Sequence, residues 1–112
     1  MIIAIIGSRS AKLEHIQKIL EILPKDCSCI VSGGAKGADA IAKRIAKEKN
    51  LPFREFLPEY NIYGKTATII RNQKIVNFAD KIIALWDFKS KGTQSTILYA
   101  IKCKKLCKVI PI

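Results

Sequence analysis

The feature that most constrains this chain of 112 residues is a regular alternation of short apolar runs with longer amphipathic segments. Residues 2–6 form an unbroken apolar run, which is typical of a strand buried on both faces. The same reasoning predicts five strands, over residues 2–6, 27–32, 52–57, 82–86 and 106–110, and four helices between them, over residues 13–23, 38–50, 66–78 and 93–102. This alternation predicts the α/β class, as a Rossmann-like three-layer α/β/α sandwich with a five-stranded parallel sheet in the order 3-2-1-4-5. The length suits a single domain over residues 1–112.

Three loops at the carboxyl ends of predicted strands carry glycine and hydrogen-bond donors. They are Gly7-Ser-Arg-Ser10, Ser32-Gly-Gly-Ala-Lys-Gly37 and Asp87-Phe-Lys-Ser-Lys-Gly-Thr93, and each precedes a predicted helix. In an open parallel sheet, ligands bind beyond these ends where the strand order reverses, here between the first and fourth strands. Glycine lets backbone approach a ligand closely, and the free N–H groups of a helix start favour an anion. The loops therefore predict a phosphate-bearing ligand; tight turns made only for helix packing are the alternative.

Two better-known phosphate motifs do not fit. The dinucleotide pattern G-x-G-x-x-G is incomplete because Ser32 occupies its first position, and the chain lacks a second dinucleotide half. Gly64-Lys65-Thr66 is similar to the end of a P-loop, but Glu59 replaces the first glycine and no predicted strand feeds directly into it. Both comparisons argue against a dinucleotide enzyme and an NTPase.

The net charge of +11 attracts phosphates, nucleic acid or acidic partners. A basic surface that serves only solubility is the alternative. The lysines spread over several predicted helices without a focused stripe, and the few aromatic residues offer no obvious stacking platform for single strands. A nucleotide-like small molecule is therefore the favoured partner, ahead of nucleic acid.

The cysteines and the apolar start of the chain favour a cytoplasmic protein. The spacings C-x-C and C-x3-C match a zinc site poorly, so the four cysteines are interpreted as buried free thiols, with Cys27 and Cys29 sharing one face of a strand. The apolar start is too short for a signal peptide and lacks a basic leader, and no run approaches the ~20 residues that cross a bilayer. We expect no metal, no cofactor and no membrane partner.

Several stretches match one known superfamily in the same order along the chain. They are Gly7-Ser-Arg9, Ser32-Gly-Gly-Ala-Lys-Gly-Ala-Asp39, Arg71-Asn72, Ala79-Asp80, and Ala84-Leu-Trp-Asp87 leading to Ser90-Lys-Gly-Thr93. On these residues the chain resembles the SLOG superfamily, which joins the DNA-processing protein DprA (Smf) to the "Lonely guy" nucleotide phosphoribohydrolases. It looks most similar to the small, single-domain YspA/YpsA-like members. The resemblance implies a Rossmann-like fold that binds nucleotides or nucleotide-derived ligands, and a homodimer or higher homo-oligomer because relatives often dimerise.

The resemblance also implies roles for individual residues. Ser8 and Arg9 would line the pocket, and Arg71 falls where the phosphoribohydrolases place a functional arginine. Phosphate would be cradled by Gly33, Gly34, Gly37, Gly92 and Thr93. Those enzymes carry the signature P-G-G-x-G-T-x-x-E, whereas here Gly92-Thr93 is kept and Thr96 stands in place of the catalytic glutamate. The predicted ligand-binding residues are Gly7, Ser8, Arg9, Ser32, Gly33, Gly34, Gly37, Asp39, Arg71, Asn72, Asp87, Lys91, Gly92 and Thr93.

Four of these side chains also admit a purely structural role. Asp39 would complement the dipole of its helix. Asn72 needs a polar partner, either a loop backbone or the ligand. Asp87 would accept from a ribose hydroxyl or cap the next loop, and Arg71 would be a solvated helix charge. The sequence therefore leaves catalytic residues undefined, with Arg71 and Asp87 as weak candidates.

Three functions are compatible with these observations. The first is a sensor or carrier that binds a nucleotide-derived ligand without turnover, and it is the one the sequence favours. The second is a nucleotide-processing hydrolase related to the phosphoribohydrolases, which would need Asp39 or Asp87 as its base. The third is DNA binding of the DprA kind, which would show a steep salt dependence.

Overall fold

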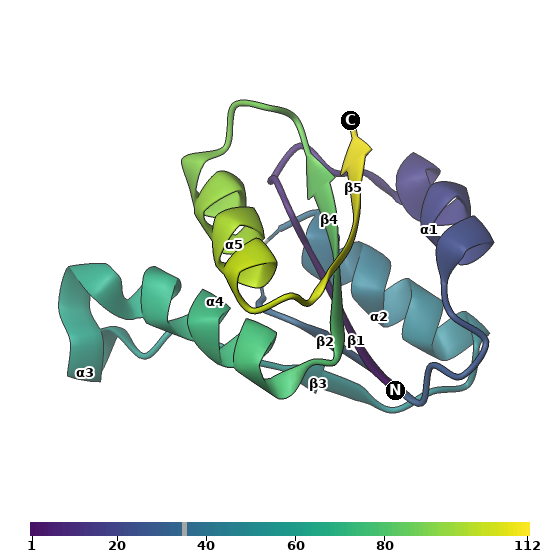
Figure 1. Ribbon diagram of the computed structural model, residues 1–112, viewed down its shortest axis with the longest axis horizontal. Helices are drawn as coiled ribbons and strands as arrows, with labels where there is room; N and C mark the ends of the chain where they lie inside the picture. The colour runs from purple at the N-terminus through teal and green to yellow at the C-terminus, as the bar shows by residue number, and fades with distance from the viewer. Residues whose placement is uncertain (35) are drawn as a thin grey trace.

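The computed structural model describes residues 1–34 and 36–112, without the side chain of Cys107. All strands run parallel in one sheet, in the order β3-β2-β1-β4-β5, which confirms the predicted order (Figure 1). The strands are β1 (Ile2–Gly7), β2 (Cys29–Ser32), β3 (Phe53–Glu55), β4 (Lys81–Trp86) and β5 (Leu106–Pro111). The central strand, β1, pairs with β2 on one side and β4 on the other, so the strand order reverses at its carboxyl end.

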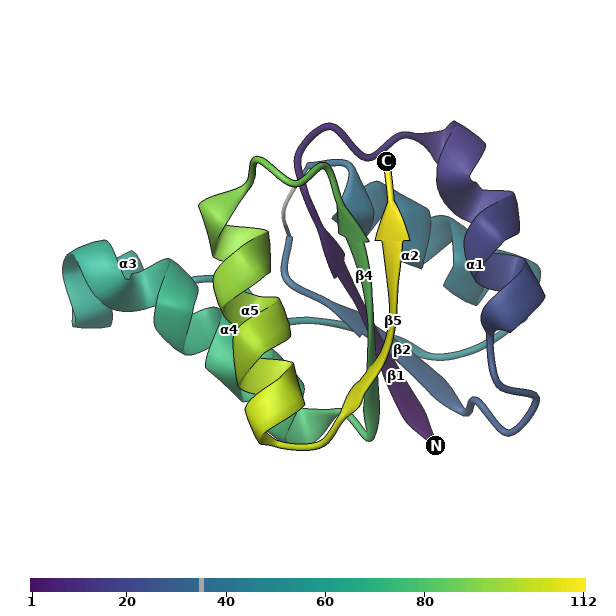
Figure 2. The same cartoon turned by 45° about the horizontal axis from the view of Figure 1, so that its top comes forward.

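Helices cover both faces of the sheet, as expected for three layers (Figure 2). The helices α1 (Ile16–Ile22) and α2 (Ala38–Glu48) lie on one face, and α4 (Ala67–Phe78) and α5 (Lys91–Lys102) lie on the other. The two cores follow the alternation of side chains along a strand: Ile3 and Ile5 of β1 face α1 and α2, whereas Ala4 and Ile6 face α4 and α5.

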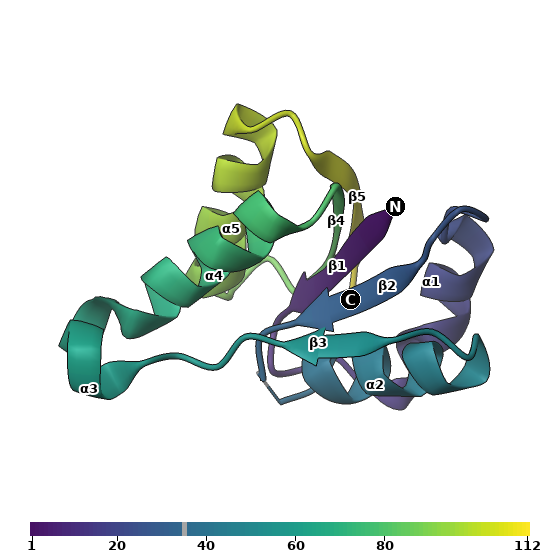
Figure 3. The same cartoon turned by 90° about the horizontal axis from the view of Figure 1, so that it is seen from below.

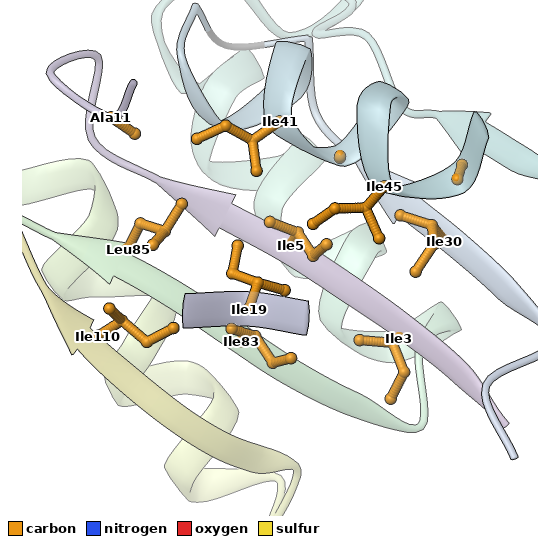
Figure 4. Packing of buried hydrophobic residues seen from close by; sticks show 12 residues of the cluster. Ile3, Ile5, Ala11, Ile19, Ile30, Ile41, Ile45, Ile83, Leu85 and Ile110 are labelled. Carbon is orange, nitrogen blue, oxygen red and sulfur yellow. The ribbon is translucent and has the colours of Figure 1, made fainter. Parts of the chain in front are cut away.

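The core under α1 and α2 consists almost wholly of aliphatic side chains (Figure 4). Ile19 of α1 and Ile41 and Ile45 of α2 are fully buried against Ile5 of the central strand. Burial of each such side chain contributes roughly 1.5–3 kcal/mol. This core fixes α2, and with it the loop that precedes it, against the sheet.

Helix boundaries differ from the predicted ones by a few residues, for identifiable reasons. The first helix begins with a 3-10 turn over Leu13–His15, so Leu13 is exposed, and the stripe predicted through it missed the fully buried Ile19. It ends at Ile22 because the residue before Pro24 is extended. The second helix ends at Glu48, two residues early, because Asn50 adopts a left-handed conformation with φ 54°.

The loop predicted between the third strand and the helix over residues 66–78 is wrong in part. Residues Tyr60–Tyr63 form a short helix, α3, followed by a 3-10 turn over Gly64–Thr66. We call residues 58–66 the arm. It projects beyond the carboxyl ends of β2 and β3 and continues directly into α4 (Figure 3). Gly64 begins the 3-10 turn with φ 56°, and Pro58 lies outside any helix or strand. Of the three residues that predicted the loop, only Asn61 is in α3.

The cysteines occupy different surroundings than predicted. Because β2 begins at Cys29, Cys27 precedes the strand and packs against the core under α1 and α2, whereas Cys29 packs against the opposite core. Cys27, Cys29 and Cys103 are free and half-buried, and burial raises the pKa of Cys27. No helix among the described residues combines the length and apolar character needed to cross a membrane.

Candidate functional site

A pocket of about 410 Å³ opens at the carboxyl ends of β1 and β2, beside the first turns of α4 and α5. It lies where the strand order reverses, which is the place predicted from the sequence. Most of the predicted ligand-binding residues line it: Gly7, Arg9, Ser32, Gly33, Gly34, Arg71, Asn72, Gly92 and Thr93. The predicted residues outside its lining are Ser8, Gly37, Asp39, Asp87 and Lys91. Ala35, which belongs to the glycine-rich stretch, lies outside the described residues.

Several lining residues are absent from the predicted ligand-binding set. They come mainly from the arm and from the faces of α4 and α5 that meet above the sheet: Lys36, Pro58, Tyr60, Thr68, Ile69, Gln73, Ser90, Ser95, Thr96 and Tyr99. The helical spacing of Thr68, Asn72 and Ile75 is a signal that could have extended the predicted site along α4. Pro58 and Tyr60 belong to residues 55–63, which we expected above the pocket as specificity elements, without a role for any single residue.

Arg71 is the half-buried cation of the pocket. Its guanidinium Nη1 donates to the carbonyl of Gly33, and its Nε donates to Oδ1 of Asn72 at 2.7 Å. Asn72 therefore finds its polar partner in the neighbouring guanidinium. Burial lowers the pKa of Arg71, and no carboxylate of the described residues forms an ion pair with it. A partly desolvated cation without an acidic partner favours an external anion.

The charges that line the pocket all have one sign. Arg9, Lys36 and Arg71 contribute positive charge, and no Asp or Glu is among the lining residues in the described part of the chain. A cleft lined by one sign of charge concentrates ligands of the opposite sign. This pocket therefore attracts anions.

The loop after β2 is held by close packing. A Cβ on Gly33 would lie 2.9 Å from Cδ of Arg71, so the absence of a side chain makes room for the arginine. Gly37 adopts φ 83°, and a Cβ there would lie 2.6 Å from the backbone oxygen of Ala11. Gly37 thus allows the loop after β2 to contact the loop after β1 at a place outside the pocket lining.

A buried carboxylate completes this loop. Oδ1 of Asp39 accepts from the backbone N–H of Gly34 at 3.1 Å, and Oδ2 lies 3.3 Å from Nζ of Lys43. The same ammonium lies 3.4 Å from Oε2 of Glu55, whose pKa is raised by its hydrogen bond to Asp39 and by burial. Asp39 therefore does not line the pocket, but its hydrogen bond holds the loop whose residues do.

The loop after β4 is held by hydrogen bonds around Asp87. Its Oδ1 accepts from the backbone N–H groups of Lys89 at 2.8 Å and Ser90 at 2.9 Å, and its Oδ2 accepts from Ser10 Oγ at 2.9 Å. These bonds lower the pKa of Asp87 to about 2, with the two backbone donors as the main cause. Ser8, which is buried, accepts from the backbone N–H of Asp87 at 3.2 Å. Ser8 and Asp87 thus join the loop after β1 to the loop after β4, and neither residue lines the pocket.

The start of α5 faces the pocket with an uncovered glycine. Ser90 caps the helix by accepting from the backbone N–H of Thr93 at 3.2 Å. A Cβ on Gly92 would meet no described protein atom within 4 Å. Thr96, which stands in place of the phosphoribohydrolase glutamate, is buried, lines the pocket and donates from Oγ1 to the carbonyl of Gly92 at 2.9 Å. Lys91 is exposed and lies outside the lining.

Comparison with known protein families agrees with this arrangement. The model of the family described as DNA recombination-mediator protein A matches residues 1–59. The chain belongs to this family. The match spans β1 through β3 and therefore includes the first two glycine loops, whereas Arg71, Gly92 and Thr93 lie beyond it. It confirms the resemblance to the DprA side of the SLOG superfamily; the YspA/YpsA-like assignment stays a prediction. Searches of curated proteins and of solved structures gave no match.

Proposed function

We propose that the chain binds a nucleotide or nucleotide-derived anion in this pocket, as a sensor or carrier and without turnover. The observation that carries the proposal is the half-buried Arg71, which has no carboxylate partner among the described residues. The other charged residues that line its pocket are also positive. The free N–H groups at the start of α5 add a second attraction for phosphate.

The size and lining of the pocket support a ligand of one nucleotide unit. Its volume of about 410 Å³ lies near the lower end of the roughly 300–1,000 Å³ typical of small-molecule sites. Thr68, Gln73 and Ser95 provide hydroxyl and amide groups suited to a ribose. A dinucleotide would need a longer cleft.

The lining argues against a hydrolase. General base catalysis needs a group within hydrogen-bonding reach of the reacting water, and His, Asp, Glu and Cys are absent from the described residues that line the pocket. Asp87 is occupied by the donors of its own loop, and Asp39 by Gly34 and Lys43. Thr96 cannot replace a carboxylate, because a hydroxyl is not a base at neutral pH.

A thermal-shift screen at moderate salt tests the proposal. The ligands are nucleoside monophosphates, cyclic nucleotides, ADP-ribose and NAD, with inorganic phosphate and single-stranded DNA as controls. A nucleotide present at ~100 times its Kd stabilises the folded protein by about 2.7 kcal/mol, a shift of several degrees for a domain of this size. The shift should vanish in Arg71→Met.

Arg44→Gln is the matched control, because it removes the same charge from an exposed arginine of α2 outside the pocket lining. It should keep the nucleotide shift. Chromatography of the incubated mixture should recover the nucleotide unchanged. Release of a free base would overturn the sensor or carrier role in favour of a hydrolase.

DNA is the second candidate ligand. The net charge of +11 favours it, and the description of the matched family names DNA. A shift with single-stranded DNA alone, which falls steeply as salt rises, would support this candidate over the nucleotide.

A further inference from the structure

The arm supplies an aromatic wall to the pocket. Tyr60 and Pro58 belong to the arm and line the pocket, although 60 % of Tyr60 is exposed. Figure 3 shows the arm beyond the carboxyl ends of β2 and β3, continuous with α4. From the sequence we expected residues 55–63 above the pocket, but no role followed for Tyr60 itself.

One apolar side chain that lines the pocket with Tyr60 is exposed and is not fully covered by the described parts of the protein. Ile69, in the first turn of α4, lines the pocket and is 50 % exposed. Exposed aromatic and aliphatic side chains beside a small-molecule pocket are typical of surface that a ligand covers.

The two tyrosines of α3 line different cavities. Tyr60 lines the positive pocket, whereas Tyr63 lines a neighbouring cavity of about 370 Å³. The ring of Tyr63 lies 5.2 Å from Nζ of Lys74 and is half-buried. Tyr63 thus has a partner within the protein, and it provides an internal control for Tyr60.

The pocket joins two kinds of surface. Donors and positive charge come from the start of α5, Arg9, Lys36 and Arg71. Tyr60 supplies a flat aromatic ring, and Ile69 supplies further apolar surface. A nucleotide has the same two parts, an anionic phosphate and a flat base, and bases stack on aromatic rings whatever their sequence of donors and acceptors.

We infer that Tyr60 stacks on the base of the bound nucleotide and thereby selects nucleotides over simple sugar phosphates. This inference rests on the proposed nucleotide site. Loss of one base–aromatic stack weakens binding by about 5- to 150-fold. The phosphate contacts at the other surface do not depend on Tyr60.

Calorimetric titration with adenosine 5′-monophosphate and ribose 5-phosphate tests the inference. Tyr60→Ala should weaken binding of the nucleotide by roughly 10- to 100-fold and leave the affinity for ribose 5-phosphate nearly unchanged. Tyr60→Phe should bind both ligands as the wild type does, because the ring is kept. Tyr63→Ala should also bind both, and circular dichroism should show that every variant is folded.

The outcomes separate this inference from the function on which it rests. If wild type binds both ligands and Tyr60→Ala binds the nucleotide equally well, the stacking role is overturned and the site stands. Equal loss of both ligands in Tyr60→Ala would also overturn selection by stacking. Arg71→Met should lose both ligands, and if wild type binds neither, the proposed function and this inference fall together.

Discussion

The loops after β2 and β4 are similar in their hydrogen bonds but differ in why they are followed or formed by glycine. Each connects a buried strand to a long helix at the carboxyl edge of the sheet, and in each an aspartate accepts from loop N–H groups. In the loop after β2, glycines are required by neighbouring atoms of the protein: Arg71 beside Gly33 and the backbone of Ala11 beside Gly37. At the start of α5, which follows the loop after β4, a Cβ on Gly92 would meet no described protein atom within 4 Å.

The difference separates two reasons for a glycine at a helix start. Where a Cβ would clash with the protein, glycine serves the fold. Where the space is open and faces a pocket, glycine weakens the helix by up to ~1 kcal/mol relative to alanine without any packing benefit. We interpret the open space beside Gly92 as room for the ligand. The following substitutions test this difference between the two loops, in order of decreasing expected effect.

Gly37→Ala should produce the largest loss of stability. The new Cβ would lie 2.6 Å from a backbone oxygen that cannot move aside easily, and φ 83° is strained for an L residue. Together these effects should lower the free energy of unfolding by roughly 2–4 kcal/mol, as measured by urea denaturation. Lys36→Ala, at the exposed neighbouring position, is the control and should unfold at nearly the wild-type urea concentration. If Gly37→Ala were as stable as wild type, the close contact between the loops after β1 and β2 would not be required for the fold.

Asp39→Ala should lower the free energy of unfolding by about 1–2 kcal/mol, because it leaves the N–H of Gly34 without its acceptor and removes a carboxylate from the first turn of α2. Asp39→Asn should lose less, since its amide oxygen can still accept from Gly34. Urea denaturation of both variants distinguishes the contributions. Equal losses would assign the whole effect to the charge of the carboxylate and none to the hydrogen bond.

Gly92→Ala should have the opposite sign. Its methyl group enters open space, so the better helix propensity of alanine should raise the free energy of unfolding by up to about 1 kcal/mol. The same methyl group should lower nucleotide affinity at least about tenfold, a loss of about 1.4 kcal/mol of binding free energy. Urea denaturation and calorimetric titration measure the two effects. Unchanged nucleotide affinity would remove Gly92 from the site.

Asp87→Asn should have the smallest effect and a characteristic pH dependence. The pKa of Asp87 in the folded protein, about 2, is below its ordinary value of 3.8, so ionised Asp87 stabilises the fold fully above pH 3.8. That stabilisation is lost as pH falls through 2. Asp87→Asn should therefore melt below wild type at pH 7, and the two melting curves should converge near pH 2. A difference in Tm that persists unchanged at pH 2 would mean that the carboxylate charge is not its source.

Much of the fold follows from local patterns. The unbroken apolar run of β1 and the amphipathic repeat of α2 predicted both elements and the parallel sheet, because burial on two faces or one leaves a periodic trace in the sequence. The arm escaped prediction because Pro58 and Gly64 are turn signals and a helix of four residues is too short to show a period.

Sequence patterns alone predicted the order of the strands, the edge of the sheet at which the pocket opens and the glycine loops at that edge. Only the tertiary structure decided which of those residues face the pocket: Gly92 and Arg71 do, whereas Gly37 and Asp87 join neighbouring loops. It also placed Tyr60 beside Arg71, although one residue belongs to the arm and the other to α4. The physical reason is that periodicity records how each element is buried, whereas a site depends on distances between elements, which are set when helices pack on the sheet.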